Sequence, residues 1–367
     1  MIDAAALANA ATRALRAYDP GHDLPALRKR FGDALAELGS NENPLGPSPH
    51  ALAAIEAALP DVFRYPDPQG IALKTALATQ LQVAAAQITL GNGSHELLML
   101  VAQCFADGGN SIVFSEFGFA VFPIATAAAG ARAIRVPALP RTHATMPRGH
   151  DLAAMADAVR TDTRVVYIAN PNNPTGTWFD DAVLDDFLAR VPATVLVVID
   201  EAYHEYVTLA GVSSAVRHLR QYPNLIVTRT FSKAYALAGL RVGYAVSAAE
   251  VAGVLERLRE SFNVNGLALA AAEAALADRE HVARARDWNL AEREWLGERL
   301  RALGLRVLPS QTNFVLIDFA ADAAPIERVL FERGVIARPM GGYGLPECLR
   351  ISVGTRAENE RLLEALP

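Results

Sequence analysis

The stretch Thr194–Tyr206, TVLVVIDEAYHEY, decides the fold that we predict for this chain. Its first residues are apolar or β-branched throughout and lead directly to Asp200. A short strand that is apolar on both faces is typical of a parallel sheet covered by helices on both sides. A carboxylate at the end of such a strand needs a positive or donor partner, so Asp200 is either a helix cap or part of a functional site.

Similar strands recur along the chain and alternate with helical segments. They are QITL, SIVF, RVVYIA and NLIVTRT, which begin at residues 87, 111, 164 and 224. This alternation predicts an α/β fold, with a mostly parallel sheet and helices on both of its faces. After about residue 266 the pattern changes to long helices and short strands, which predicts a smaller α+β domain. We therefore expect three parts: a helical N-terminal arm, 1–44, packing with the small domain; a large domain, 45–266; and the small domain, 267–367.

Composition excludes several classes of partner. The chain has 367 residues, with 34 basic and 40 acidic side chains and a formal charge of −6, which does not favour nucleic acid as a partner. Its two cysteines, Cys104 and Cys348, give no disulfide framework and no metal-ligand spacing, so we expect no metal and a reducing compartment. The N-terminus has no basic segment before its apolar part, and no apolar run is long enough to span a membrane. These features predict a cytoplasmic protein without a membrane partner.

One lysine lies in an otherwise apolar, small-residue stretch, RTFSKAYALAGLRVGY, at residues 229–244. Lys233 follows a predicted strand end, with Ser232 beside it and Arg241 between glycines downstream. A buried lysine either finds a partner or loses its proton, and a neutral amine is a nucleophile.

Two loops at predicted strand ends add polar groups. In ITLGNGSHELLML, Gly91 and Gly93 precede a helix start with Ser94 as the expected N-cap, and such a turn either binds an anion or is a plain strand-to-helix connection. In YIANPNNPTGT, the asparagines up to Asn173 alternate with prolines, which gives a rigid loop that aims its amides or a simple polar turn. With Lys233, Asp200 and a tyrosine, these loops describe a pyridoxal phosphate pocket in which Lys233 forms the Schiff base.

The chain resembles the fold-type-I pyridoxal-phosphate-dependent aminotransferases, and among them the histidinol-phosphate aminotransferase family, from about residue 40 to the C-terminus. The motifs that carry the resemblance occur in the family's order: NENPLGPSP, RYPDPQG, NPNNPTG, DEAYHEY, RTFSKAYALAGLRVGY, FNVNGLA and CLRISVGT. The resemblance implies a large domain like that of aspartate aminotransferase. It also implies transamination between L-glutamate/2-oxoglutarate and histidinol phosphate/imidazole acetol phosphate in histidine biosynthesis, with pyridoxal 5'-phosphate as cofactor.

The resemblance assigns roles to individual residues. Lys233 would carry the cofactor and transfer the proton, Asp200 would pair with the pyridinium nitrogen, and Tyr203 would hold the phenolate oxygen together with Asn173. Phe119 would stack on the ring. The cofactor's phosphate would be bound by Gly93, Ser94, His95, Thr230, Ser232 and Arg241, and the substrates by Asn43, Arg338 and Arg350.

Tyr65 corresponds to a family tyrosine that reaches the cofactor of the neighbouring subunit, which implies a homodimer with shared active sites. Two positions depart from the family's pattern: His95 stands where Asp or Asn is common, and Phe119 where a tyrosine is usual. Three alternatives remain at this point: an aromatic amino-acid aminotransferase, a phospho-amino-acid decarboxylase of the same fold, and a cofactor-binding regulatory domain without turnover.

Overall fold

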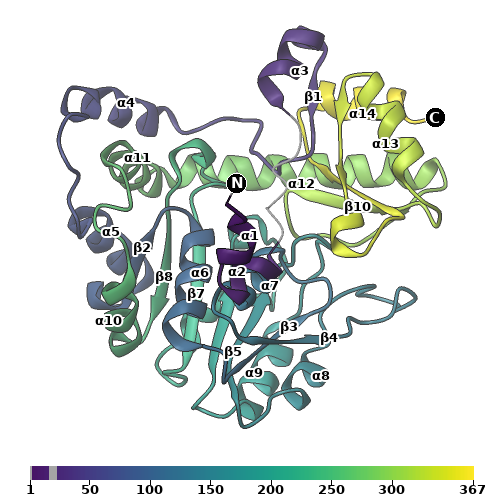
Figure 1. Ribbon diagram of the computed structural model, residues 1–367. Coiled ribbons are helices and arrows are strands. Elements are labelled where there is room, and N and C mark those ends of the chain that lie inside the picture. Colours follow the sequence, from purple (N-terminus) through teal and green to yellow (C-terminus); the bar gives the residue numbers. More distant parts are fainter. Residues whose placement is uncertain (1, 16–22) are drawn as a thin grey trace.

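A seven-stranded sheet forms the centre of the computed structural model, which describes residues 2–15 and 23–367 (Figure 1). Its strand order is β2-β8-β7-β6-β5-β3-β4. The bounds are β2 Ile88–Gly91, β3 Ser111–Ser115, β4 Arg132–Val136, β5 Thr163–Ala169, β6 Leu196–Asp200, β7 Leu225–Thr230 and β8 Gly243–Ser247. In this sheet β8 runs in the direction opposite to the other six strands. The prediction of an α/β fold with a mostly parallel sheet is confirmed.

Side chains alternate between two apolar layers, because successive residues of a strand point to opposite faces. In β6, Val197 and Ile199 face one layer and Val198 faces the other. The first layer is covered by α5 (Ile71–Leu81), α8 (Leu152–Asp157), α9 (Asp181–Arg190) and α11 (Gly266–Ala277). The second is covered by α6 (Ser94–Phe105), α7 (Val121–Ala128) and α10 (Ala249–Leu258). Burial of both faces explains why the strands are apolar throughout.

The C-terminal part of the chain builds a second, smaller sheet, of order β12-β13-β10-β9. Its strands are β9 Arg306–Val307, β10 Phe314–Asp318, β12 Arg338–Pro339 and β13 Cys348–Ser352, with helices α13 Ala324–Glu332 and α14 Arg356–Ala365. The long helix α12 (Arg279–Ala302) runs between this sheet and the large one (Figure 1). Near the N-terminus, β1 (Ala36–Glu37) pairs in parallel with β11 (Val335–Ile336). The domain boundaries at 44 and 266 stay a prediction.

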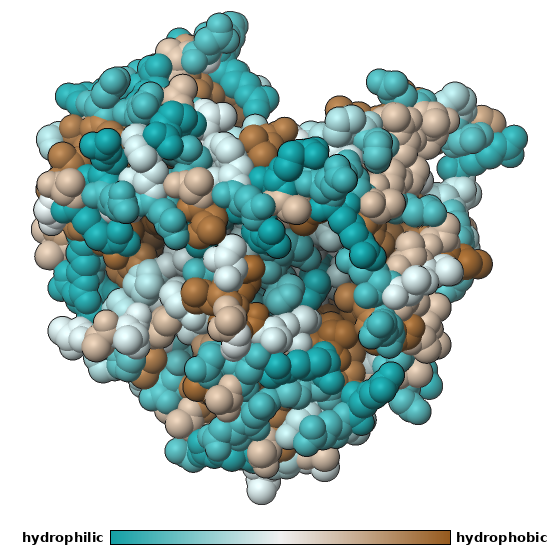
Figure 2. Space-filling view, turned by 180° about the vertical axis from the view of Figure 1, so that it is seen from behind, coloured by the Kyte–Doolittle hydropathy of each residue, from teal (hydrophilic) through white to brown (hydrophobic). Residues whose placement is uncertain are grey.

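The segment from α4 (Pro49–Ala58) to the turn before α5 stands out from the body of the molecule, at the upper left of Figure 1 and the upper right of Figure 2. The remaining N-terminal helices are α1 Ala4–Leu7, α2 Ala10–Ala14 and α3 Leu24–Phe31. Part of the expected helical arm, residues 1 and 16–22, lies outside the described residues. In the described part of the chain, no helix combines the length and hydrophobicity that crossing a membrane requires.

One local expectation was wrong. The N-cap of α6 is Gly93, with φ +82°, and Ser94 is already the first helical residue. Glycine adopts a positive φ at little cost, so the tight turn after β2 is made by Gly93 rather than capped by a serine side chain.

Candidate active site

A cavity of about 1060 Å³ opens at the carboxyl ends of β5, β6 and β7. In mostly parallel sheets this edge is where ligands bind, because the loops that follow the strands converge there. The cavity brings together twelve of the residues singled out in the sequence: Ser94, His95, Phe119, Asn173, Asp200, Tyr203, Thr230, Ser232, Lys233, Arg241, Arg338 and Arg350.

Lys233 lies in the turn after β7, where its Nζ donates to the carbonyl oxygens of Ser40 (3.2 Å) and Asn41 (3.3 Å). Burial and the positive charge of Arg350 lower the pKa of the Lys233 amine to about 8. At neutral pH a usable fraction of this amine is therefore unprotonated, and the unprotonated form is the nucleophile.

Asp200 ends β6 on the floor of the cavity and is 4% exposed. Thr228 donates to its Oδ1 over 2.8 Å. Burial raises the pKa of this carboxyl to about 6, and among the described residues no cationic side chain forms an ion pair with it. A ligand with a positively charged N–H group would supply that partner.

Asn173 and Tyr203 face the cavity from neighbouring strand ends. Arg350 donates to Asn173 Oδ1 over 2.7 Å, which leaves the Nδ2 protons of Asn173 available to a ligand. Burial raises the pKa of the Tyr203 phenol to about 12, so it carries its proton at neutral pH. Both side chains can therefore donate hydrogen bonds to an anionic oxygen in the cavity.

An anion site forms where the turn before α6 meets the segment after β7. Ser232 accepts from Arg241 Nη1 over 3.2 Å and from the hydroxyl of Thr230 over 3.0 Å. A Cβ on Gly243 would lie 2.7 Å from Ser94 N, and a Cβ on Gly93 would lie 2.5 Å from Arg241 Nη2. Both glycines therefore allow the helix N-terminus and the guanidinium to approach each other, as a phosphate cradle requires.

The two departures from the family's pattern both lie in the cavity. Burial and then the charge of Arg241 lower the pKa of the His95 imidazole, which favours the neutral form of the ring. Phe119 packs edge-on against Phe122, with 6.1 Å between ring centroids. Neither side chain adds a negative charge to the anion site.

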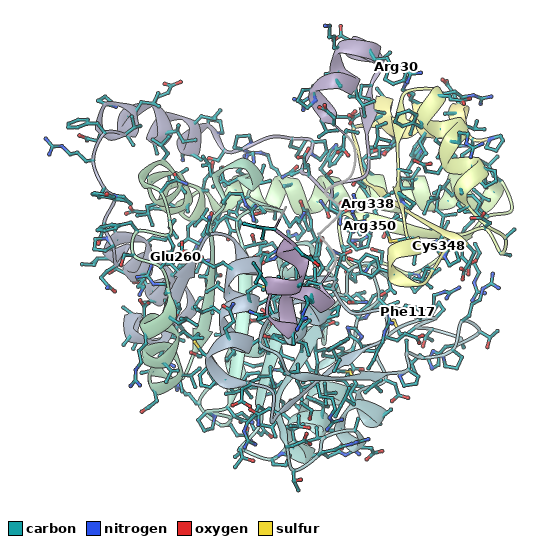
Figure 3. The ribbon with its side chains drawn as sticks, in the orientation of Figure 1. Arg30, Phe117, Glu260, Arg338, Cys348 and Arg350 are labelled. Atoms are coloured by element: carbon teal, nitrogen blue, oxygen red, sulfur yellow. The ribbon has the colours of Figure 1, made fainter. Side chains whose placement is uncertain are left out.

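Arg338 and Arg350 stand directly opposite each other on the paired strands β12 and β13 (Figure 3). Residues in such positions project from the same face of a sheet. Arg350 is buried, and its Nη2 donates to Gly39 O over 2.6 Å. The small sheet therefore presents two guanidinium groups at the wall of the cavity.

Three predicted residues are not among those that line this cavity within one chain: Gly93, in the turn before α6, Tyr65 and Asn43. Tyr65 is 83% exposed and stacks on Phe262, with 4.7 Å between ring centroids. Asn43 donates to Ala234 O over 2.9 Å and lines a neighbouring cavity of about 460 Å³.

Sequence reasoning missed three residues that the structure places at the site: Asn41, Thr228 and Tyr343. Thr228 precedes Thr230 by two positions on β7, so the period of a strand places it on the same face. Tyr343 accepts from the backbone N–H of Ala120 over 3.4 Å and lines the cavity. Asn41 opens the NENP motif, but no local pattern indicates that its amide contacts Tyr203.

The donor set fits pyridoxal phosphate. Asp200 is a buried carboxylate with no cationic partner among residues 2–15 and 23–367, Lys233 is an amine with a lowered pKa, and Gly243 leaves a cradle that a Cβ would fill. Together with the α/β fold, this arrangement defines an enzyme of the pyridoxal-phosphate-dependent kind.

The chain belongs to the class I and II aminotransferases, whose family model matches residues 34–366. Histidinol-phosphate aminotransferase 2 of Pseudomonas aeruginosa is 50% identical over 100% of this chain and 98% of its own length. The protein of the same name from Pseudomonas fluorescens is 51% identical over 98% of this chain and 96% of its own length.

Solved structures agree with this assignment. Histidinol-phosphate aminotransferase from Sinorhizobium meliloti, in complex with pyridoxal-5'-phosphate, superposes with a TM-score of 0.87 at 34% identity, over 98% of this chain and 96% of that one. L-threonine-O-3-phosphate decarboxylase from Porphyromonas gingivalis has a TM-score of 0.78 at 22% identity, over 90% of this chain and 98% of that one. The second likeness concerns the fold alone, so the fold does not separate transamination from decarboxylation.

Proposed function

We propose that this enzyme transfers an amino group between L-glutamate/2-oxoglutarate and histidinol phosphate/imidazole acetol phosphate, in histidine biosynthesis. The observation that carries the proposal is the sequence identity of 50% and 51%, over nearly the full length, to two histidinol-phosphate aminotransferases. The pair Arg338 and Arg350 supports it, since both substrates bring an anionic group to the same wall.

Several residues would hold the cofactor. Asp200 would accept a hydrogen bond from its ring nitrogen, Asn173 and Tyr203 would donate to its phenolic oxygen, and Phe119 would cover its ring. Its phosphate would be held by the turn Gly93–His95 and by Thr230, Ser232 and Arg241. When bound, pyridoxal phosphate supplies an electron sink next to the substrate's amino-bearing carbon.

Lys233 would move the proton. Its Nζ, with a pKa of about 8, would take the proton from the amino-bearing carbon of the substrate and hold it. The carbonyl oxygens of Ser40 and Asn41 would orient the amine, because both accept from Nζ in this structure.

Arg350 would bind the anionic end of each substrate in turn. Glutamate offers a carboxylate and histidinol phosphate offers a phosphate, and a planar guanidinium binds both with two parallel hydrogen bonds. Arg338 lies opposite it and would add a second positive charge. We assign a substrate role to Asn43 as well, beside the carbonyl of Ala234.

We also propose a homodimer with shared active sites. The projecting segment exposes the large apolar side chains of Phe63 (74%) and Tyr65 (83%), and Ile71 (63%) is exposed at the start of α5. Leu258 and Phe262 are exposed as well, and Phe262 stacks on Tyr65. Large apolar side chains exposed in this number are commonly covered by another protein, and a second copy would bring Tyr65 to the partner's cavity.

We place the protein in the cytoplasm. Cys104 and Cys348 are both free thiols, as in a reducing compartment, and cofactor and substrates are charged metabolites.

Half-reactions with single substrates test the proposed function. The purified protein with pyridoxal phosphate should change its visible absorption when L-glutamate or histidinol phosphate is added alone, and should form glutamate from 2-oxoglutarate and histidinol phosphate. Phenylalanine and tyrosine serve as rival amino donors, and carbon dioxide release from a phospho-amino acid reports decarboxylation. Faster turnover of an aromatic amino acid than of histidinol phosphate, or carbon dioxide release, would favour one of the two enzymatic alternatives.

A further inference from the structure

Asn41 joins the small sheet to the active-site cavity through five hydrogen bonds of its side chain and backbone. It is 1% exposed and lies in the loop that follows β1. Its N–H donates to Ser352 Oγ over 2.8 Å, and its carbonyl oxygen accepts from Asn313 Nδ2 over 2.9 Å. On the cavity side, its Nδ2 donates to the Tyr203 hydroxyl over 2.9 Å, and its carbonyl oxygen also accepts from Lys233 Nζ.

The hydrogen bonds of the Asn41 side chain determine which way its amide group is turned. The Ser352 hydroxyl donates to Asn41 Oδ1 over 3.2 Å, so Oδ1 faces the small sheet and Nδ2 must face Tyr203. The Tyr203 oxygen therefore acts as an acceptor toward Asn41, and its own proton points elsewhere. Among the described residues, Asn41 is the only hydrogen-bond partner of that hydroxyl. Phe314 packs edge-on against the tyrosine ring, with 5.3 Å between ring centroids, and Tyr203 is one of the residues that line the cavity.

The backbone restricts which residue can do this. Asn41 has φ +56°, a left-handed conformation that asparagine, aspartate and glycine tolerate better than other residues. Glycine would keep the backbone and lose both amide groups. Aspartate would keep the backbone and the shape, but it would present an acceptor where the amide presents a donor.

We propose that Asn41 is a positioning residue that holds the Tyr203 hydroxyl as a hydrogen-bond donor directed into the cavity. The identity of the acceptor, the cofactor's phenolic oxygen, rests on the proposed function. The direction of the hydroxyl rests on the contacts of Asn41 alone.

The test is a double-mutant cycle read from absorption spectra without substrate. The pKa of the visible band of bound pyridoxal phosphate is titrated in the parent, in Asn41→Gly, in Asn41→Asp, in Tyr203→Phe and in Asn41→Asp combined with Tyr203→Phe. The new carboxylate would accept a hydrogen bond from the Tyr203 hydroxyl and turn its proton away from the cavity. Asn41→Asp should therefore raise the pKa of the band by about one unit, a tenfold change. Asn41→Gly removes more atoms but adds no new acceptor, so it should shift the pKa of the band by less than half as much.

The combined variant separates positioning from simple charge. The charged groups facing Tyr203 are Lys233, Arg350 and Asp200, and none of them is altered. If Asn41 acts through the hydroxyl, most of the Asn41→Asp shift should disappear in the Tyr203→Phe background. An equal shift in both backgrounds, or a larger shift for Asn41→Gly than for Asn41→Asp, would overturn the proposal.

Ser352→Ala gives an independent variant if the Asn41 changes impair folding, which thermal unfolding of each cofactor-free protein would reveal. Without the Ser352 hydroxyl the amide of Asn41 is free to turn, so a shift in the same direction is expected, again only where Tyr203 is present. A parent that develops no visible band with pyridoxal phosphate would count against the proposed function. A normal band with the same pKa in Ser352→Ala and every folded Asn41 variant would count against the role of Asn41 only.

Discussion

Asp200 is a single buried carboxylate that makes the stability of the cofactor-free protein depend on pH. Burial raises its pKa to about 6 from the ordinary 3.8. The folded chain therefore keeps this proton at pH values where the unfolded chain has lost it. We expect the contribution of Asp200 to the free energy of unfolding to fall by roughly 3 kcal/mol as the pH rises from about 4 to about 6.

Urea unfolding of the cofactor-free protein at several pH values measures this dependence. Asp200→Asn should flatten the decline between these pH values, because an amide does not titrate. Saturating pyridoxal phosphate should also reduce the decline in the parent, since its ring nitrogen would supply the missing positive partner. Equal pH slopes for the parent and Asp200→Asn would assign the decline to another group.

Arg350 is the residue at which both substrates should meet. Arg350→Lys keeps a positive charge but loses the planar fork of the guanidinium. We therefore expect kcat/KM to fall for glutamate and for histidinol phosphate together, by an amount that corresponds to roughly 2–4 kcal/mol of lost transition-state stabilisation. The measurement is steady-state kinetics with each substrate varied in turn. Arg338→Lys, on the opposing strand, is the matched variant and should have the smaller effect. A loss confined to one substrate would mean that the two anions have separate sites.

At the scale of elements, the contact between β8 and the turn before α6 should control cofactor binding. A Cβ on Gly243 would meet two backbone atoms, Ser94 N at 2.7 Å and Arg229 O at 2.8 Å, and backbone cannot move aside as a flexible side chain can. We expect Gly243→Ala to lower the free energy of unfolding by roughly 1–3 kcal/mol and to weaken pyridoxal phosphate binding.

Gly239→Ala is the control for this change, because a Cβ at Gly239 would have no heavy atom within 4 Å. Urea unfolding and a cofactor titration should leave Gly239→Ala close to the parent. Indistinguishable behaviour of the two alanine variants would show that the close approach at Gly243 does not matter.

The sequence predicts the elements whose patterns are local, and it misses those that depend on distant partners. The apolar strands ending at Asp200 and Thr230 were predicted because burial on both faces leaves a continuous apolar run. The antiparallel direction of β8 was not, since a strand's direction is set by how the chain returns to the sheet. The expected N-cap at Ser94 was wrong because the positive φ of Gly93 already makes the turn.

The candidate site divides in the same way. Lys233, Asp200 and Asn173 follow predicted strand ends, so the fold class alone brings them to one edge of the sheet. The contacts of Asn41 with Tyr203 and Ser352 join residues that are far apart in the chain. A local pattern in the sequence does not indicate such contacts.

At the scale of the whole molecule, a mixture of two inactive variants tests whether Tyr65 acts across a dimer interface. In a hybrid of Lys233→Ala with Tyr65→Ala, one site would have Lys233 from one chain and Tyr65 from the other. Random exchange of equal amounts should therefore restore about a quarter of the parent's activity. Activity is measured after subunit exchange, which native mass spectrometry can confirm. Exchange without recovery would mean that Tyr65 serves its own chain.

The pairing of β1 with β11 has a consequence for synthesis of the protein. The loop after β1 supplies both carbonyl oxygens to Lys233 Nζ, and it is fixed by Val335, Asn313 and Ser352, which leave the ribosome late. Arg350, which helps to lower the basicity of Lys233, also arrives late. A prematurely terminated chain thus contains the lysine without the surroundings that make it reactive. We therefore expect the lowered pKa of the Lys233 amine, which burial and the charge of Arg350 cause, only in the finished polypeptide.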